Sequence, residues 1–193
     1  MTAGSQDIKP LIIAGLAAIA LHPAIAVNAI KNSDLTMNDG MGGIVGWSVR
    51  SPAGSSADVR AAGGGVVSAE FGGERRSYFR QYPLTLQSGG RYRLRVDVRT
   101  AGLGGAKIQL ILWDSGWHSD VGTEPFPDDT KGEWRTMEWT GRIMRNDQPD
   151  GYSVALAGDG GSAGKVRLEV RNMSLEPLTP EAEAATTDRK SVV

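Results

Sequence analysis

Apolar and polar residues alternate most strictly between residues 91 and 99, where the chain reads RYRLRVDVR. A period of two places successive side chains on opposite faces of an extended strand. One face then carries only apolar side chains, and the other carries arginines and Asp97. The segment therefore predicts a strand that packs one face on a core and leaves the other in solvent, as in one layer of an antiparallel sandwich.

Two further segments, 166–171 and 152–156, alternate in the same way, and the turn signal Asp150-Gly151 precedes the second of them. No stretch after residue 31 keeps a helical apolar period for three turns, which excludes the crossover helices of parallel α/β folds. The sequence predicts an all-β fold, a two-sheet antiparallel sandwich of about eight or nine strands. The remaining candidate strands, separated by clusters of Gly, Pro, Asn and Asp, are 44–50, 66–71, 77–82, 107–114 and 134–140.

The beginning of the chain is different, because Leu11 to Ile30 form a continuous, largely apolar segment without a formal charge. About 20 apolar residues suffice for one helix to cross a bilayer, so the segment predicts an N-terminal hydrophobic helix. His22 and Pro23 lie in its middle, where an imidazole and a missing backbone donor are unfavourable against lipid.

The same segment also fits a cleaved signal peptide. Its apolar region would run from Leu11 to Leu21, and cleavage would follow Ala26 or Ala29. Both interpretations stay open. Both place the rest of the chain on the periplasmic or extracellular side of a membrane, anchored through the helix or secreted.

These patterns divide the chain into four parts. Residues 1–10 are a cytoplasmic or signal-peptide leader, 11–30 the signal peptide or transmembrane anchor, 31–176 the sandwich domain and 177–193 a flexible tail. The tail is rich in Pro, Ala, Thr and Glu, which offers too little apolar surface to offset the entropy of ordering it.

Composition narrows the functional classes. The 22 acidic and 21 basic residues nearly cancel, so no overall field draws the chain to nucleic acid or to anionic lipid. The absence of cysteine excludes disulfides, thiolate metal sites and cysteine nucleophiles, and the 26 glycines favour turns over long helices. We expect neither a nucleic-acid partner nor a cofactor.

A series of short motifs punctuates the expected strands. They are Asn32-Ser33-Asp34-Leu35, Gly46-Trp47, Arg80-Gln81-Tyr82-Pro83-Leu84, Gly89-Gly90-Arg91-Tyr92-Arg93-Leu94, Trp134 and Val170-Arg171-Asn172-Met173-Ser174-Leu175-Glu176. Their order resembles that of the carbohydrate-binding module superfamily of the family four and nine type. The resemblance implies a β-sandwich jelly roll that binds glycan without catalysing a reaction.

One departure from the family concerns a metal ion. In that family the opening segment and the last strand often supply carboxylates for a structural calcium. Thr36 and Asn172 stand at the corresponding positions here, so the resemblance does not extend to calcium and we expect no metal site.

A glycan site needs an aromatic face for the apolar side of a sugar ring, and amide, carboxylate or guanidinium groups for its hydroxyls. The richest supply is WDSGWHSD at 113–120. Trp113 is out of phase with the apolar residues at 108, 110 and 112, which predicts a ring on the outer face of the sheet, and Gln109 shares its phase. The candidate ligand-binding residues are Trp113, Trp117, His118, Asp114, Gln109 and Arg80.

The alternative is that Trp113 packs under a loop or a partner and that Trp117 anchors a loop. Tyr78 and Tyr82 flank Arg80 at period two and offer a second platform, which an edge strand would explain equally well. Three other tryptophans are expected in the core or at its rim: Trp47, Trp134 and Trp139.

Catalysis has little support. His118 stands near Asp114, Asp120 and Glu124 in the sequence, which would allow a general base, but loop composition produces such neighbours by chance. We therefore expect a protein that is not an enzyme. The arginines at 91, 93, 95 and 99 are expected to form a solvated face.

Two functions remain. The first is a glycan-binding sandwich at the cell surface or in the periplasm. The alternative is a single-pass accessory subunit of a multi-subunit membrane complex, for example a respiratory or photosynthetic one, whose sandwich clamps other subunits outside the cytoplasm. In that case His22 and Pro23 would face neighbouring helices, where a polar group and a kink find partners.

Overall fold

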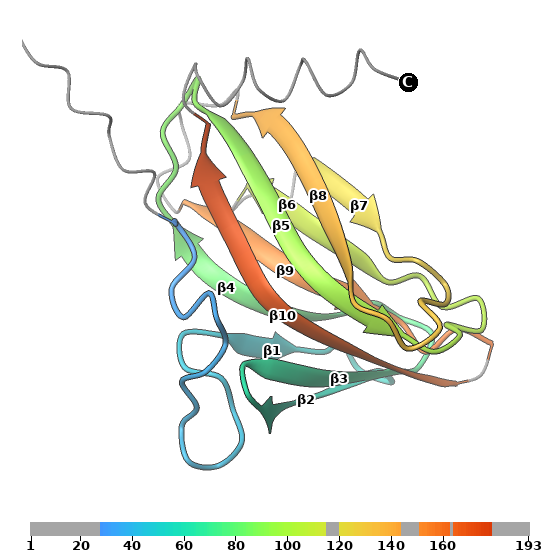
Figure 1. The fold of residues 1–193 in the computed structure, drawn as a ribbon. Helices are drawn as coiled ribbons and strands as arrows, with labels where there is room; N and C mark the ends of the chain where they lie inside the picture. Colours follow the sequence, from blue (N-terminus) through green and yellow to red (C-terminus); the bar gives the residue numbers. More distant parts are fainter. Residues whose placement is uncertain (1–27, 115–119, 144–150, 163, 179–193) are drawn as a thin grey trace, which may run out of the picture.

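The computed structural model describes residues 28–114, 120–143, 151–162 and 164–178, and for residues 114 and 120–124 it describes the backbone alone. Figure 1 shows these residues as strands joined by turns and loops. The strands are β1 (Ser48–Arg50), β2 (Ser56–Gly63), β3 (Val66–Gly72), β4 (Ser77–Leu84), β5 (Arg91–Thr100), β6 (Gln109–Asp114), β7 (Asp120–Pro125), β8 (Arg135–Arg142), β9 (Tyr152–Gly158) and β10 (Lys165–Pro177).

The strands form two five-stranded antiparallel sheets. The first sheet has the order β1-β4-β9-β6-β7, and the second has the order β2-β3-β10-β5-β8. In Figure 1 the strands β10, β5 and β8 lie in front of β9, β6 and β7. The prediction of an all-β, two-sheet antiparallel sandwich is confirmed.

The core lies between the inward faces of the two sheets, where period-two alternation is kept. Strand β5 alternates buried and half-buried residues along its whole length. Its inward Val96 and Val98 are fully buried, as are Val154 and Leu156 on β9 of the facing sheet. Each large apolar side chain removed from water contributes about 1.5–3 kcal/mol, so this alternation is the main source of the fold's stability.

The residues before the first strand are part of the sandwich. The Ala29 amide donates to the Leu175 carbonyl over 2.8 Å, and the Asn28 side chain accepts from the Leu175 amide over 2.9 Å. On the other side, the Gln81 amide group exchanges two hydrogen bonds with the Lys31 backbone. These contacts fix the entering chain to both sheets.

Ile30 lies at the expected boundary between the apolar segment and the sandwich. It was expected to close the membrane segment, but it is 3% exposed and belongs to the sandwich core. The rest of the predicted segment, including Leu11, Leu21, His22 and Pro23, lies outside the described residues. Within the described ranges, no helix has both the length and the apolar character needed to cross a bilayer.

Most expected strands are confirmed, with shifts at their ends. The segment expected at 44–50 is a strand only over its last three residues, Ser48–Arg50. β10 continues to Pro177, and the Leu178 amide donates to the Arg91 carbonyl, so the sandwich extends past residue 176. Strands β2 and β7 were not expected, because neither carries the large apolar side chains at alternate positions that mark the others.

Two of the tryptophans expected in the core or at its rim pack there. Trp47 stacks on Phe79 with ring centroids 4.7 Å apart, and Trp139 packs against the core from β8. Trp47 thereby holds the loop before β1 against the first sheet.

Candidate functional site

The outward face of the first sheet carries a second, smaller apolar cluster. Strand pairing places Tyr78 of β4 beside Ala157 of β9, and Trp113 of β6 beside Ser153 of β9. The face continues over the neighbouring outward residues of β4 and β6 by strand alternation. We call it the aromatic face and define it by Tyr78, Arg80, Tyr82, Gln109, Ile111, Trp113, Ser153, Ala155 and Ala157.

Alanines on the central strand form the floor of this face. Tyr78 and Trp113 stand on β4 and β6, on either side of β9, and are offset along it, at the levels of Ala157 and Ser153, yet their ring centroids approach to 5.4 Å in an edge-to-face contact. The two rings lean toward each other across β9 because Ala155 and Ala157 leave room above it, and both alanines are fully buried as a result.

Arg80 and Tyr82 form the more open part of the face. The guanidinium of Arg80 lies 5.5 Å from the centre of the Tyr82 ring, a cation–π contact. Tyr82 is 43% exposed. Burial lowers the pKa of Arg80, and the nearby positive charge of Arg50 lowers it further. The open part thus presents an aromatic ring beside a guanidinium in a locally positive field.

The structure brings three of the predicted site residues onto one face. Trp113, Gln109 and Arg80 all point outward from the first sheet, as the phase of their strands predicts. Trp113 is only 4% exposed, so its ring is a packed part of the face instead of an open platform. Its burial follows from the contact with Tyr78 over the small residues of β9.

The other predicted site residues are not placed by the structure. Asp114 ends β6, but its side chain is not described. Trp117 and His118 lie outside the described residues. Their role in binding stays a prediction.

Sequence reasoning missed the floor of the face. Ser153, Ala155 and Ala157 alternate with larger apolar residues, so the pattern of small residues at every second position of β9 was the available signal. The Ser153 hydroxyl is buried and makes no hydrogen bond to any described group. The exposed platform is on β4, which the sequence offered only as a second choice.

A cavity of about 370 Å³ adjoins the aromatic face at the edge of the first sheet. Arg50 lies at the end of β1, Arg75 and Arg76 precede β4, and Tyr78 belongs to both the cavity and the aromatic face. We call this cavity the arginine pocket; it is lined by Arg50, Ser51, Pro52, Arg75, Arg76 and Tyr78.

The outward face of the second sheet carries charges that neutralise each other. Trp134 lies between the guanidiniums of Arg99 and Arg171, 4.7 and 4.2 Å from its ring centre. The expected solvated arginine face is therefore a network of ion pairs with neighbouring strands. The pairs are Arg93–Glu176, Arg95–Glu138, Arg99–Glu169, Arg171–Asp97 and Lys165–Glu70.

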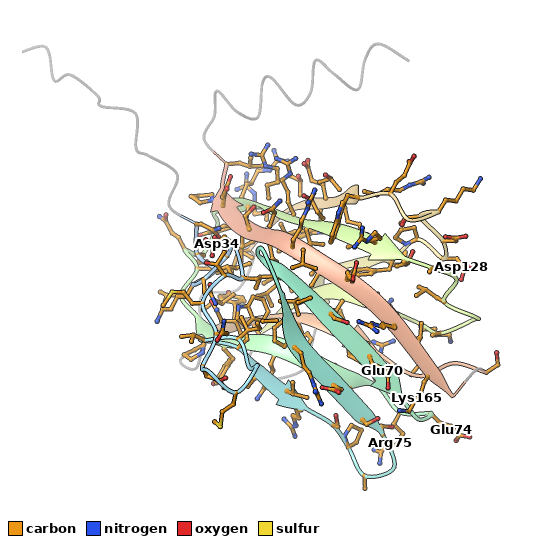
Figure 2. All side chains as sticks on the ribbon, turned by 60° about the horizontal axis from the view of Figure 1, so that its bottom comes forward. Asp34, Glu70, Glu74, Arg75, Asp128 and Lys165 are labelled. Carbon is orange, nitrogen blue, oxygen red and sulfur yellow. The ribbon has the colours of Figure 1, made fainter. Side chains whose placement is uncertain are left out.

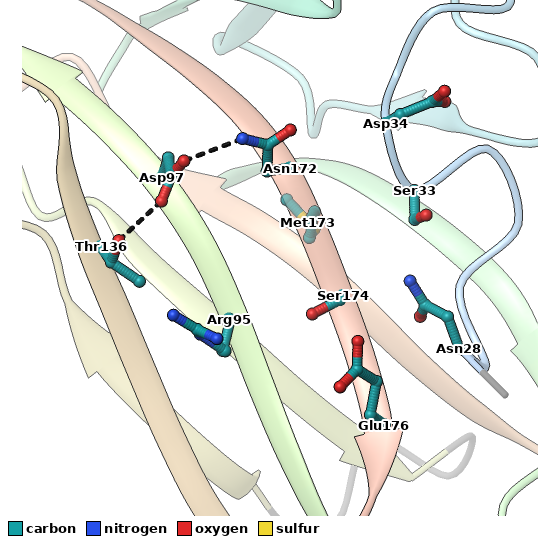
Figure 3. Close-up of a pocket in the computed structure, with 10 residues that line it drawn as sticks. All are labelled: Asn28, Ser33, Asp34, Arg95, Asp97, Thr136, Asn172, Met173, Ser174 and Glu176. Atoms are coloured by element: carbon teal, nitrogen blue, oxygen red, sulfur yellow. Dashed lines mark hydrogen bonds between the residues drawn. The ribbon is translucent and has the colours of Figure 1, made fainter. Parts of the chain in front are cut away.

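A second cavity of about 370 Å³ lies on this face, between β8, β5, β10 and the entering chain (Figure 3). Asp97 lines the cavity and accepts hydrogen bonds from Thr136 over 2.7 Å and from Asn172 over 2.9 Å. Burial opposes the charged form of Asp97, but these hydrogen bonds and the charge of Arg171 outweigh it and lower the pKa of this carboxyl. Asp97 therefore joins three elements of the sandwich.

The residues of this cavity do not assemble a cation site. Asn172 donates its amide to Asp97, and the backbone amide of Thr36 bonds to Asp34 at the far side. Among the described residues, no three acidic or histidine side chains converge on one point. Asp97, Thr136 and Asn172 bond to one another, which indicates a structural role for these three residues.

No family model matches the sequence, and no curated protein matches it. Solved structures do match. One described as "CBM4 structure and function" is 16% identical over 70% of this chain and 97% of its own, with a TM-score of 0.56. A cyclase from Fischerella sp. TAU is 13% identical over 80% of this chain and 98% of its own, with a TM-score of 0.52.

The match with the highest TM-score of these, 0.59, is an arabinose-bound GH51 α-L-arabinofuranosidase, 14% identical over 83% of this chain. This chain spans only 29% of that enzyme. Other matches are further carbohydrate-binding modules. At these identities the comparisons show the fold alone, a β-sandwich that these carbohydrate-binding modules and the cyclase share.

Proposed function

We propose that this chain is a non-catalytic glycan-binding sandwich whose aromatic face contacts the sugar. The observation that carries the proposal is the outward cluster of Tyr78 and Trp113 over the alanine floor, bordered by the exposed Tyr82. An outward aromatic cluster beside polar groups is what a sugar ring requires, because its C–H face is apolar and its edge carries hydroxyls.

In this proposal the residues have distinct tasks. Tyr78 and Tyr82 pack against sugar rings, while Arg80 and Gln109 donate hydrogen bonds to hydroxyls. Trp113 positions the Tyr78 ring through their edge-to-face contact. The modules among the structural neighbours support this class of ligand, and they do not favour the alternative of an accessory subunit in a membrane complex.

The test is affinity electrophoresis in gels that contain a panel of neutral and acidic polysaccharides. We expect retention of the wild type by at least one polymer. Tyr82→Ala weakens that binding about fivefold or more, since an aromatic contact of this kind is worth roughly 1 kcal/mol or more, whereas Tyr82→Phe keeps the ring and the retention.

Trp134→Ala is the matched control, because it removes an aromatic ring from the outward face of the second sheet. It leaves retention unchanged. Migration of the wild type that no polymer slows would contradict the proposal, as would equal retention of wild type and Tyr82→Ala.

Export is part of the proposal and is based on the apolar segment 11–30. The sandwich contacts of Asn28 and Ala29 favour cleavage after Ala26 over cleavage after Ala29, because only the former leaves both residues in the mature chain. N-terminal sequencing of the mature protein tests this: we expect Val27, or Met1 if the segment is kept as an anchor. A start at Ile30 would contradict it.

A further inference from the structure

The arginine pocket continues from the aromatic face. Tyr78 contacts Trp113 on that face and also lines the cavity, so a sugar packed on Tyr78 lies next to the arginines. The cavity volume of about 370 Å³ falls in the range of roughly 300–1,000 Å³ that small-molecule sites occupy.

The lining of the pocket is positive and contains no acidic residue. Neither Arg75 nor Arg76 takes part in the ion pairs found among the described residues. Glu74 lies at the same corner of the molecule, as Figure 2 shows, but it is exposed and does not line the cavity. The corner therefore carries an excess of positive charge.

The excess extends along β4 into the aromatic face. Arg50 is close enough to Arg80 that its charge contributes to lowering the pKa of Arg80. Such a concentration of like charge occurs in a chain whose formal net charge is only −1. A local positive potential of this kind attracts anions without attracting them to the rest of the surface.

We propose that the arginine pocket binds the carboxylate of an acidic sugar, so that the glycan recognised by this chain contains uronic acid. Guanidinium groups match the planar, two-oxygen geometry of a carboxylate, and Tyr78 holds the sugar ring that carries it. The inference rests on the proposed function and names its ligand class.

The test compares polygalacturonate with the same polymer after methyl esterification, which keeps the backbone and removes the charge. Wild type binds polygalacturonate at least about tenfold more tightly than the ester, and the double variant Arg75→Gln/Arg76→Gln loses that preference. Both arginines precede β4, and the backbone bond from the Arg75 amide to Ser55 does not depend on the side chain, so the variant should fold.

Arg135→Gln/Arg142→Gln is the matched control, because it removes two exposed arginines from β8 of the second sheet. It keeps the preference for the acid polymer. Circular dichroism and thermal unfolding establish that both double variants are folded.

Equal affinity for the acid and its ester overturns the inference, and so does a double variant that binds polygalacturonate like wild type. Equal binding of dextran sulfate or DNA also overturns it, because that result shows general attraction to polyanions. Tyr82-dependent binding of neutral polymers without tighter binding of polygalacturonate overturns the inference alone, whereas the absence of binding to every polymer overturns the proposed function with it.

Discussion

The two outward faces of the sandwich have the same strand geometry and opposite chemistry. At the centre of the first sheet, β9 turns Ala155 and Ala157 outward under aromatic rings. At the centre of the second sheet, β10 turns Arg167 and Glu169 outward, where Glu169 pairs with Arg99. The outward face of the first sheet buries an apolar cluster that is separate from the core. The outward face of the second sheet carries ion pairs that contact solvent.

The difference between the faces favours the first sheet as the surface for a partner. On the second sheet each ion pair already satisfies its own charges, and exposed pairs contribute only about 0–1 kcal/mol each. On the first sheet an exposed tyrosine, a guanidinium and an arginine-lined cavity lie side by side. The asymmetry is the physical basis for assigning binding to the first sheet.

We expect the largest change in the free energy of unfolding when a charged side chain is placed on the outward face of β9, compared with removing one from β10. Ala157→Glu places a carboxylate on the floor of the aromatic face, where its cross-strand neighbours Tyr78 and Gln109 carry no charge, and we expect it to destabilise the fold by about 3–5 kcal/mol. The reciprocal change Glu169→Ala on β10 costs less than about 1 kcal/mol. Urea unfolding measures both, and similar costs would remove the distinction between the faces.

Removing one tryptophan from each face changes the free energy of unfolding by a smaller amount. Trp113→Ala opens a cavity beside Tyr78 and lowers the free energy of unfolding by about 3 kcal/mol. Trp134→Ala loses only contacts with two guanidiniums, worth about 1 kcal/mol. Thermal or urea unfolding of the two variants checks this, and an equal loss would show that the aromatic face is no better packed than the opposite one.

The acid sensitivity of the second face comes partly from Asp97. Its pKa is lowered in the folded protein below the ordinary value of 3.8, so its stabilising contribution is complete above that value and is lost as the pH falls through the folded pKa. Asp97→Asn should cost about 1–2 kcal/mol at neutral pH. It should also flatten the decline of stability below about pH 5; an unchanged decline would contradict the assignment.

The smallest effect is expected for the exposed pair Arg95–Glu138, whose nitrogen and oxygen are 3.3 Å apart. Glu138→Gln should change the free energy of unfolding by about 0.5 kcal/mol or less, and the change should fade in high salt. A cost above that of Trp113→Ala would mean that surface charge, not packing, dominates this sandwich.

The sequence predicted the fold well where strands bury large side chains. Strict alternation located β5, β9 and the first half of β10, because one apolar face facing the core leaves a period-two signal. Strand β2 turns only Ala57, Val59 and Ala61 toward the core, and β7 reads DVGTEP, so both escaped detection. They are strands because they pair with β3 and β6, and their own sequences show no alternation of large apolar residues.

The site was predicted only in part, for a related reason. The alternation of residues along β4 and β6 predicts that Trp113, Gln109 and Arg80 point outward. How deeply each side chain is buried depends on the residues of the adjacent strand. Ala155 and Ala157 let Trp113 collapse onto Tyr78, a packing that no local pattern reveals. The arginine pocket joins residues from β1 and from the segment before β4, which only the fold brings together.

Backbone amide chemical shifts of isotope-labelled protein, recorded with cellohexaose and with hexagalacturonate at millimolar concentration, map the glycan contacts residue by residue. If the first sheet binds the sugar, the shifts caused by at least one of them concentrate on β4, β9 and β6 around Tyr78, Arg80 and Ala155. Shifts confined to β5, β8 and β10, or no shifts with either sugar, would contradict it.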